Sequence, residues 1–182
     1  MLGGPFSSSL LDGPRETKPE SDLRLLDGRK QFSVMLDYEF GVGTSKALPK
    51  AGLRFVYSKR SERMKQVIHG DMLFATIRPN GVIAPTYYGA TVLMKSKKYA
   101  ENTVVVEQDA VEFVREGRSV FCKFVKGVGR HVLPSGEVAV LDPAGRVIAV
   151  GSARIHGDFM REFKHGVAVK TRGTAEKDDS SV

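Results

Sequence analysis

The chain has 182 residues, which is room for one domain of ordinary size or two small ones. Hydrophobic residues make up 41% of it, enough for a core, but no apolar run reaches the about 18 residues of a membrane-spanning helix. The single cysteine excludes an internal disulfide framework and a cysteine-rich zinc site. Because no signal-peptide pattern opens the sequence either, we expect a cytoplasmic protein without a membrane segment.

The net charge of +7 is concentrated in the middle of the sequence. Residues 23–101 hold fourteen Lys and Arg against six Asp and Glu, while residues 102–173 hold eleven against eight. The segments on either side, 1–22 and 174–182, each carry two more acidic than basic residues. This distribution favours a polyanionic partner, although a basic surface can also serve solubility alone.

Residues 1–22 and 174–182 lack sustained hydrophobic periodicity, so we expect a disordered arm and a disordered tail. Between them, residues 23–101 predict a small domain with a helix over part of 25–40 packed on an antiparallel sheet. The apolar residues near one face of this helix are Phe32, Met35, Leu36 and Phe40. The strands predicted for this domain, with a last apolar run after them, are Leu53–Tyr57, Met64–Ile68, Met72–Ile77, Gly81–Pro85 and Ala90–Met94.

Residues 102–173 alternate short apolar runs with turn signals, which predicts a second, mostly β domain with two short helices. The first helix has an apolar face made of Ala110, Val111, Phe113 and Val114. It ends at Gly117, where a left-handed cap needs a residue without Cβ. The second helix is predicted within 158–163. The predicted strands of this domain are Thr103–Val106, Ser119–Val125, Gly136–Asp142, Arg146–Ala153 and Gly166–Arg172.

The second domain resembles a known RNA-binding module. Its matching segments are Val104–Val106, the helix ending in Gly117 and Arg118, Val120–Val125, Ala149–Gly151 and Lys164–Lys170. They resemble the PUA domain, a pseudo-barrel found on tRNA- and rRNA-modifying enzymes, although Ser135–Val138 departs from the family's Gly-Asp-Glu-Val. The expected fold class is therefore α+β, with a small helix-plus-antiparallel-sheet domain followed by a PUA-type β pseudo-barrel.

The first domain carries a resemblance of its own. Its segments Asp37–Gly41, Ser61–Val67, Leu73–Arg78 and Gly89–Ala90 follow one another in the order of a known domain. They are similar to the domain that precedes the PUA domain in archaeal tRNA-guanine transglycosylases, which install the precursor of archaeosine in tRNA. The family differs in having Gln where Glu39 stands and a Thr-Gly-Arg-Ile-Arg-like strand where residues 61–65 stand.

The resemblance implies a function without chemistry in this chain. Catalysis in that family belongs to a (β/α)₈ barrel with paired aspartates and a cysteine-rich zinc site, and such a barrel takes about 250 residues. Because this chain of 182 residues is shorter than such a barrel, we expect it to contain no catalytic residues, cofactor or metal. We expect instead a tRNA-binding subunit of a split transglycosylase, whose catalytic chain is a separate partner. The alternatives are a free-standing PUA factor acting on rRNA or the translation machinery, and an enzyme in its own right.

The resemblance also implies where RNA would bind. In PUA domains the groove lies between the glycine loop after the first helix and the closing strand, where a small residue lets backbone amides approach a phosphate. The residues that match this groove are Gly117, Arg118, Ser119, Lys123, Lys126 and Arg130, flanked by Lys170 and Arg172. Each of these charges could instead be a solvated surface charge. Phe121 and Phe124 are expected in the core first and as stacking residues second, and Cys122 as a buried, inert thiol.

Overall fold

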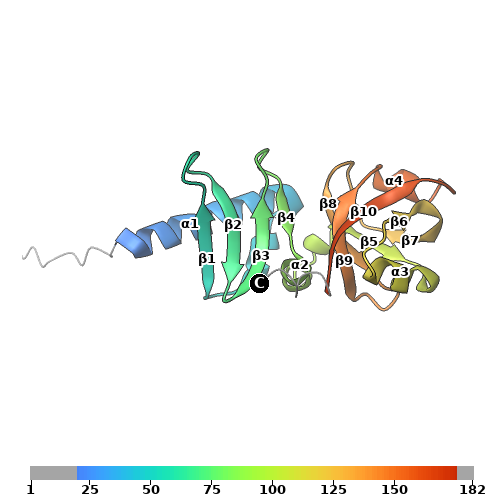
Figure 1. Cartoon of the computed structure of the whole chain (residues 1–182), viewed down its shortest axis with the longest axis horizontal. Helices are drawn as coiled ribbons and strands as arrows, with labels where there is room; N and C mark the ends of the chain where they lie inside the picture. The colour runs from blue at the N-terminus through green and yellow to red at the C-terminus, as the bar shows by residue number, and fades with distance from the viewer. Residues whose placement is uncertain (1–19, 176–182) are drawn as a thin grey trace, which may run out of the picture.

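The computed structural model describes residues 20–175 (Figure 1). The predicted arm, 1–22, therefore lies almost wholly outside the described residues, although helix α1 (Glu20–Phe40) already begins at Glu20. The predicted tail, 174–182, lies outside them from residue 176 onwards. None of the helices in the described part of the chain combines the length and the apolar character that crossing a membrane requires.

The first domain is a four-stranded antiparallel sheet with α1 lying across one face (Figure 1). The strands follow one another in the order β1-β2-β3-β4, so each is joined to its neighbour by a short turn. Their bounds are β1 Leu53–Tyr57, β2 Met64–His69, β3 Met72–Ile77 and β4 Ile83–Pro85. The predicted strands agree closely with these bounds, while α1 is longer than the predicted helix and is followed by a 3₁₀ turn, η1 (Thr44–Ala47).

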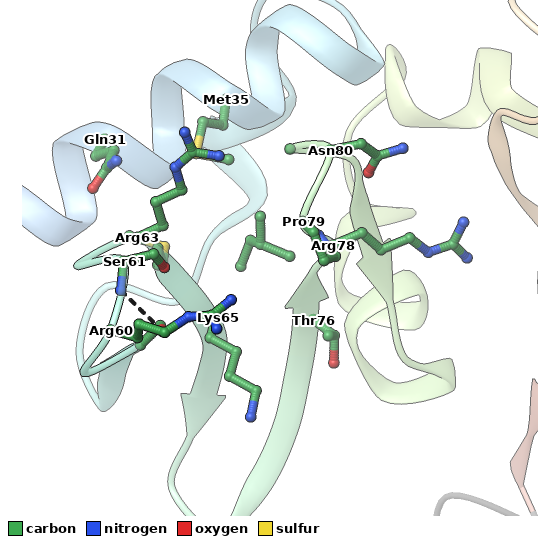
Figure 2. Close-up of a pocket in the computed structure, with 14 residues that line it drawn as sticks. Gln31, Met35, Arg60, Ser61, Arg63, Lys65, Thr76, Arg78, Pro79 and Asn80 are labelled. Atoms are coloured by element: carbon green, nitrogen blue, oxygen red, sulfur yellow. Dashed lines mark hydrogen bonds between the residues drawn. The ribbon is translucent and has the colours of Figure 1, made fainter.

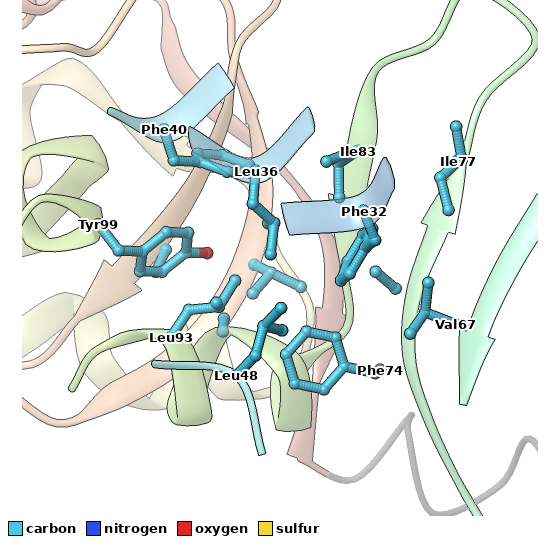
Figure 3. Packing of buried hydrophobic residues seen from close by; sticks show 14 of the residues in the cluster. Phe32, Leu36, Phe40, Leu48, Val67, Phe74, Ile77, Ile83, Leu93 and Tyr99 are labelled. Atoms are coloured by element: carbon cyan, nitrogen blue, oxygen red, sulfur yellow. The ribbon is translucent and has the colours of Figure 1, made fainter. Parts of the chain in front are cut away.

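The core of this domain follows from the helical spacing of three apolar residues. Phe32, Leu36 and Phe40 recur every four residues on α1, and each is almost completely buried (Figure 3). The ring of Phe32 meets that of Phe74 from β3 edge to face, with the centroids 6.1 Å apart. The predicted apolar face of the helix is therefore the face that packs on the sheet.

The apolar run predicted after β4 forms a helix, α2 (Tyr87–Leu93), rather than a strand. Its first turn is capped by Thr86, whose Oγ1 accepts a hydrogen bond from the Gly89 amide at 3.1 Å. Gly89 also allows α2 to press against β3, since a Cβ there would lie 2.0 Å from the carbonyl oxygen of Phe74. The cap and the close approach decide the helix, and neither is visible in apolar periodicity.

The second domain is a six-stranded sheet in the order β6-β10-β9-β8-β5-β7. Its strands are β5 Thr103–Val106, β6 Val120–Phe121, β7 Val125–Val128, β8 Glu137–Leu141, β9 Val147–Ala153 and β10 Val167–Thr174. Its helical elements are η3 Gln108–Ala110, α3 Val111–Arg115, η4 Cys122–Phe124 and α4 Gly157–Met160. All but the β5–β8 pair are antiparallel.

The predicted strand Ser119–Val125 is wrong in a way that explains the barrel. The structure divides it into β6 and β7, which occupy the two opposite edges of the sheet. Only the three residues of η4 separate them, so the edges must curl toward each other and nearly close the sheet. Hydrogen bonds hold this turn on both sides, from the Cys122 amide to Gly166 and from the Glu107 amide to Phe124. Cys122 is buried as predicted.

The two domains meet through a continuous apolar core. The buried cluster around α1 includes Leu141 and Val147 from the β8–β9 hairpin of the second domain. The linker between the domains, η2 (Tyr99–Asn102), is part of this contact, because Tyr99 is buried and its ring lies 5.1 Å from that of Phe40. The Asn102 side-chain amide donates to the Phe40 carbonyl at 3.2 Å.

Candidate RNA interface

The loop after α3 is shaped by Gly117. The Gly117 amide donates to the carbonyl of Val114 at 2.9 Å, and the Arg118 amide donates to that of Phe113 at 3.0 Å. This pair of bonds is the Schellman arrangement that ends a helix, and it needs a left-handed residue at the position of Gly117, whose φ is 90°. The predicted glycine cap is confirmed, and it turns the next residues toward β10.

Arg118 is exposed at the tip of this loop and is held only loosely. Its Nε lies 3.2 Å from Oε2 of Glu116, and its guanidinium lies 5.4 Å from the centre of the Phe113 ring. Both members of the ion pair are largely exposed, so it contributes little to stability. The guanidinium can therefore exchange this pair for a phosphate at small cost.

The closing strand runs directly beside the loop, as the resemblance implies. Thr171 Oγ1 donates to the carbonyl of Arg118 at 2.8 Å, and the register pairs Val169 with Val120. Lys170 lies on β10 between these two contacts, and its side chain is exposed. The structure thus brings Gly117, Arg118, Ser119 and Lys170 to one place.

Lys123 and Lys126 lie on the segment that joins the two edges of the barrel sheet, β6 and β7. Lys123 lies on η4, where its Nζ is 4.7 Å from the centre of the Phe124 ring. Lys126 follows on β7, and both side chains are exposed. Arg118, Lys123 and Lys126 thus follow one another along the chain from the loop after α3 through η4 to β7, and Lys170 lies on β10, the strand beside that loop.

Two residues implied by the resemblance lie elsewhere. Arg130 follows the far end of β7 and lines a separate hollow of about 580 Å³ with Arg161 and Asp158. Arg172 faces the first domain, since its Nη2 donates to the Pro85 carbonyl at 2.6 Å, and the same nitrogen donates to Oε2 of Glu137, in its own domain, at 3.0 Å. Arg172 therefore serves the contact between the domains.

Two aromatic side chains are exposed where the sequence favoured the core. Phe113, expected on the apolar face of the first helix, is 48% exposed, and Phe121, expected in the core first and as a stacking residue second, is 45% exposed. Exposed aromatic rings beside cations are the usual stacking platform for unpaired bases. The helical spacing gave no sign of this for Phe113, because α3 has only five residues and turns it outward. Phe124 is half-buried against the barrel core.

Within the described residues, no group of three or more His, Cys, Asp and Glu side chains is arranged to hold a metal ion. Burial raises the pKa of the Cys122 thiol, which disfavours the reactive thiolate.

A nearly closed barrel, a short glycine-capped helix and a closing strand beside it define a PUA domain. Residues 102–174 match the family model of the PUA domain. Residues 30–99 match the family described as the patch-forming domain C2 of tRNA-guanine transglycosylase. The chain is a PUA-domain protein whose two domains resemble the C-terminal part of archaeal tRNA-guanine transglycosylases.

Curated relatives agree with both matches. The tRNA-guanine(15) transglycosylase of Methanocaldococcus jannaschii is 35% identical over 141 residues, which are 76% of this chain and 22% of the relative. That of Thermococcus kodakarensis is 30% identical over 180 residues, which are 97% of this chain and 30% of the relative. The chain thus spans less than a third of the length of these relatives.

Solved structures show the same fold. A hypothetical protein from Pyrococcus horikoshii superposes with a TM-score of 0.64 at 22% identity, covering 82% of this chain and 90% of that one. A conserved PUA domain protein from Thermoplasma acidophilum superposes with a TM-score of 0.59 at 17% identity, covering 82% and 89%. Both likenesses extend over the two domains.

Proposed function

We propose that this chain binds tRNA and is the non-catalytic, RNA-binding subunit of a split archaeal tRNA-guanine transglycosylase in archaeosine modification. The observation that carries the proposal is the tandem order of the two domains, patch-forming domain C2 followed by PUA domain. A PUA domain alone occurs on many RNA enzymes, whereas this tandem corresponds to the C-terminal part of the named transglycosylases. The catalytic barrel of the same system is its partner chain, and the cytoplasm is where both meet tRNA.

The surface proposed for tRNA comprises the loop after α3, η4 and β7, together with the neighbouring part of β10. The residues assigned to it are Gly117, Arg118, Ser119, Lys123, Lys126 and Lys170. Structured RNA is recognised largely through phosphates and 2′-hydroxyls, which a row of exposed cations and loop amides suits. The two exposed phenylalanines beside it are placed to stack on an unpaired end.

Binding to tRNA is tested by its dependence on salt. If about five phosphates are contacted, log K falls with log salt at a slope of roughly −3.5 to −4.5. Filter binding between low and moderate salt measures the slope. Retained tRNA binding with a slope near zero would show that the cations serve another purpose.

The accessory role is tested by exchange of labelled guanine into tRNA. The purified chain alone is expected to give no exchange. Addition of this chain to a transglycosylase catalytic chain is expected to raise the rate of guanine exchange at limiting tRNA, because this chain binds the tRNA substrate. Turnover by this chain alone contradicts the proposal. Co-purification with ribosomes and no effect on exchange would instead support the free-standing PUA factor.

A further inference from the structure

The first domain contains a hollow that the proposed surface does not use. It opens at the end of the sheet where the β1–β2 loop and the β3–β4 turn approach α1, and its volume is about 1000 Å³ (Figure 2). That volume is at the upper end of the range of ligand pockets. The charged residues that line it are Arg60, Arg63, Lys65 and Arg78.

All the charged residues that line this hollow are positive. No Asp or Glu side chain is among its lining residues, and the acidic residue of the loop, Glu62, does not contribute to it. Arg78 already pairs with Glu137 of the second domain, and Figure 2 shows it extending away from the other cations. Among the described residues, Arg60, Arg63 and Lys65 have no carboxylate within ion-pairing distance. Like charges gathered without a counter-ion favour an anionic ligand.

The loop that carries Arg60 and Arg63 is a turn held by backbone hydrogen bonds. The Ser58 amide donates to the Arg63 carbonyl, and the Glu62 amide donates to the Ser58 carbonyl, both at 2.9 Å. Glu62 has a φ of 52°, a conformation that side-chain-bearing residues adopt at a cost of about 1 kcal/mol. These contacts fix the positions from which Arg60 and Arg63 project, and Figure 2 shows Arg63 extending toward α1.

The floor of the hollow is apolar. Met64 and Ile77, which line it from β2 and β3, are only 4% and 8% exposed, and Met35 lines it from α1. A phosphate alone gains nothing from such a floor, because burial against apolar atoms disfavours charge. A ligand that combines phosphates with a flat ring system with apolar faces fits both parts.

We propose that this hollow binds an unpaired nucleotide of the RNA, with its base against the apolar floor and the neighbouring phosphates on Arg60, Arg63 and Lys65. The inference rests on the proposed RNA-binding function. Proteins read RNA mostly at unpaired nucleotides, whose bases can leave the stack and enter a pocket. The hollow would be a second contact, in the other domain from the surface along α3, η4 and β7.

The test compares two double variants. Arg60→Gln/Arg63→Gln removes two cations from the rim, while Lys50→Gln/Arg54→Gln removes two exposed cations at the opposite end of β1. The probes are an RNA duplex and the same duplex with one bulged nucleotide, with thermal melts to confirm folding. The wild type is expected to bind the bulged RNA about tenfold more tightly, the value of one base stacked in a pocket.

The rim variant is expected to lose this preference and to flatten the salt slope by about 1.4 to 1.8, the share of two phosphates. The control variant is expected to keep the preference. Equal binding of both RNAs by the wild type, or an unchanged preference in the rim variant, overturns the inference while leaving RNA binding intact. Absence of binding to either RNA or to tRNA by the wild type is instead the failure of the proposed function. A rim variant that binds RNA normally but no longer binds the catalytic chain also overturns it, since the hollow is then a protein contact.

Discussion

The φ of 90° at Gly117 creates a demand for glycine that exists whether or not RNA binds. Gly117→Ala is therefore expected to lower the free energy of unfolding by about 1 kcal/mol. A role in RNA binding adds a second effect, because a Cβ at the loop keeps a phosphate away from the amides. Thermal melts together with tRNA filter binding separate the two effects. If the variant is folded and binds tRNA with wild-type affinity, Gly117 serves only to end the helix.

Arg118 gives the complementary measurement, because its side chain is exposed and only loosely paired. Arg118→Ala is expected to leave the free energy of unfolding within about 0.5 kcal/mol of wild type. It is expected to weaken tRNA binding, and less so as salt rises. Lys95→Ala, an exposed cation of the first domain, is the matched control. Equal losses in both variants would show only a general effect of net charge.

Glu39 makes stability depend on pH. Burial raises the pKa of Glu39 to about 7, and the Glu137 carboxylate adds to the rise, against the hydrogen bond from the Ile83 amide and the charge of Arg78. The ordinary pKa, which the unfolded state has, is 4.5. Between about pH 4.5 and 7 the folded state therefore keeps a proton that the unfolded state has released. The free energy of unfolding therefore falls as the pH rises through that window.

Glu39→Gln, which installs the residue typical of the family, removes this dependence. The variant is expected to match wild type near pH 4.5 and to exceed it at pH 8 by about 1 kcal/mol, a value reduced for the partial exposure of the side chain. Urea unfolding at both pH values measures the difference. A gain of the same size at both would mean that the charge of Glu39 is not its cause.

At the scale of elements, the sequence predicted what local pattern controls. Strands Leu53–Tyr57 and Met72–Ile77 were predicted to the residue, because alternation and turn signals bound them on both sides. The sequence predicted only an apolar run at 90–94 and not helix α2. The cap by Thr86 and the close contact of Gly89 with β3 determine that helix. Ser119–Val125 was predicted as one strand because barrel closure is a property of the whole sheet.

The β8–β9 hairpin depends on one buried carboxylate. Asp142 Oδ1 accepts from the amides of Ala144 and Arg146 at 3.0 and 2.9 Å, and Oδ2 accepts from the Arg146 guanidinium at 2.8 Å. Burial alone would raise the pKa of Asp142, but these bonds hold it below its ordinary value. Its stabilisation is therefore present above the ordinary pKa, 3.8, and is lost as the pH falls through the lower folded value.

Asp142→Ala is expected to lower the free energy of unfolding at pH 7 by about 2 kcal/mol, because two part-buried amides and the Arg146 guanidinium lose their acceptor. Asp142→Asn keeps an oxygen for the amides and is expected to lose about half as much. The loss from either substitution should shrink at pH 3. Chemical denaturation of the three proteins at both pH values tests this, and a loss that is the same at pH 3 excludes the charge as its source.

At the scale of the molecule, the candidate site was predictable only where one domain determines it. The loop at Gly117 and the strand carrying Lys170 follow from the pattern of the PUA domain, and the structure places them together. Arg172 stands two residues further along the same strand, and its sequence context is just as basic. Its direction depends on the docking of the first domain, which brings Pro85 and Arg78 to the barrel. No pattern within either domain contains that information.

We therefore expect opposite effects from substituting Lys170 and Arg172, although both lie on β10. Glu137 is buried, with only 1% of its side chain exposed, and it binds Arg172 of its own domain and, across the domain contact, Arg78. Arg172→Ala removes the side-chain donor to the Pro85 carbonyl and the donor to one Glu137 oxygen. It should therefore lower the free energy of unfolding by about 2 kcal/mol, less than for a fully buried pair because Arg78 remains.

The same Arg172→Ala variant should keep wild-type tRNA affinity at a temperature where it is folded, because the lost cation faces the first domain. Lys170→Ala should do the reverse, with stability within about 0.5 kcal/mol of wild type and a salt-dependent loss of tRNA affinity. Both variants remove one positive charge, so each is the control for the other. Denaturation and filter binding of the pair measure both quantities. A loss of tRNA affinity in Arg172→Ala as large as in Lys170→Ala would place the RNA across the domain contact and extend the proposed surface to Glu137.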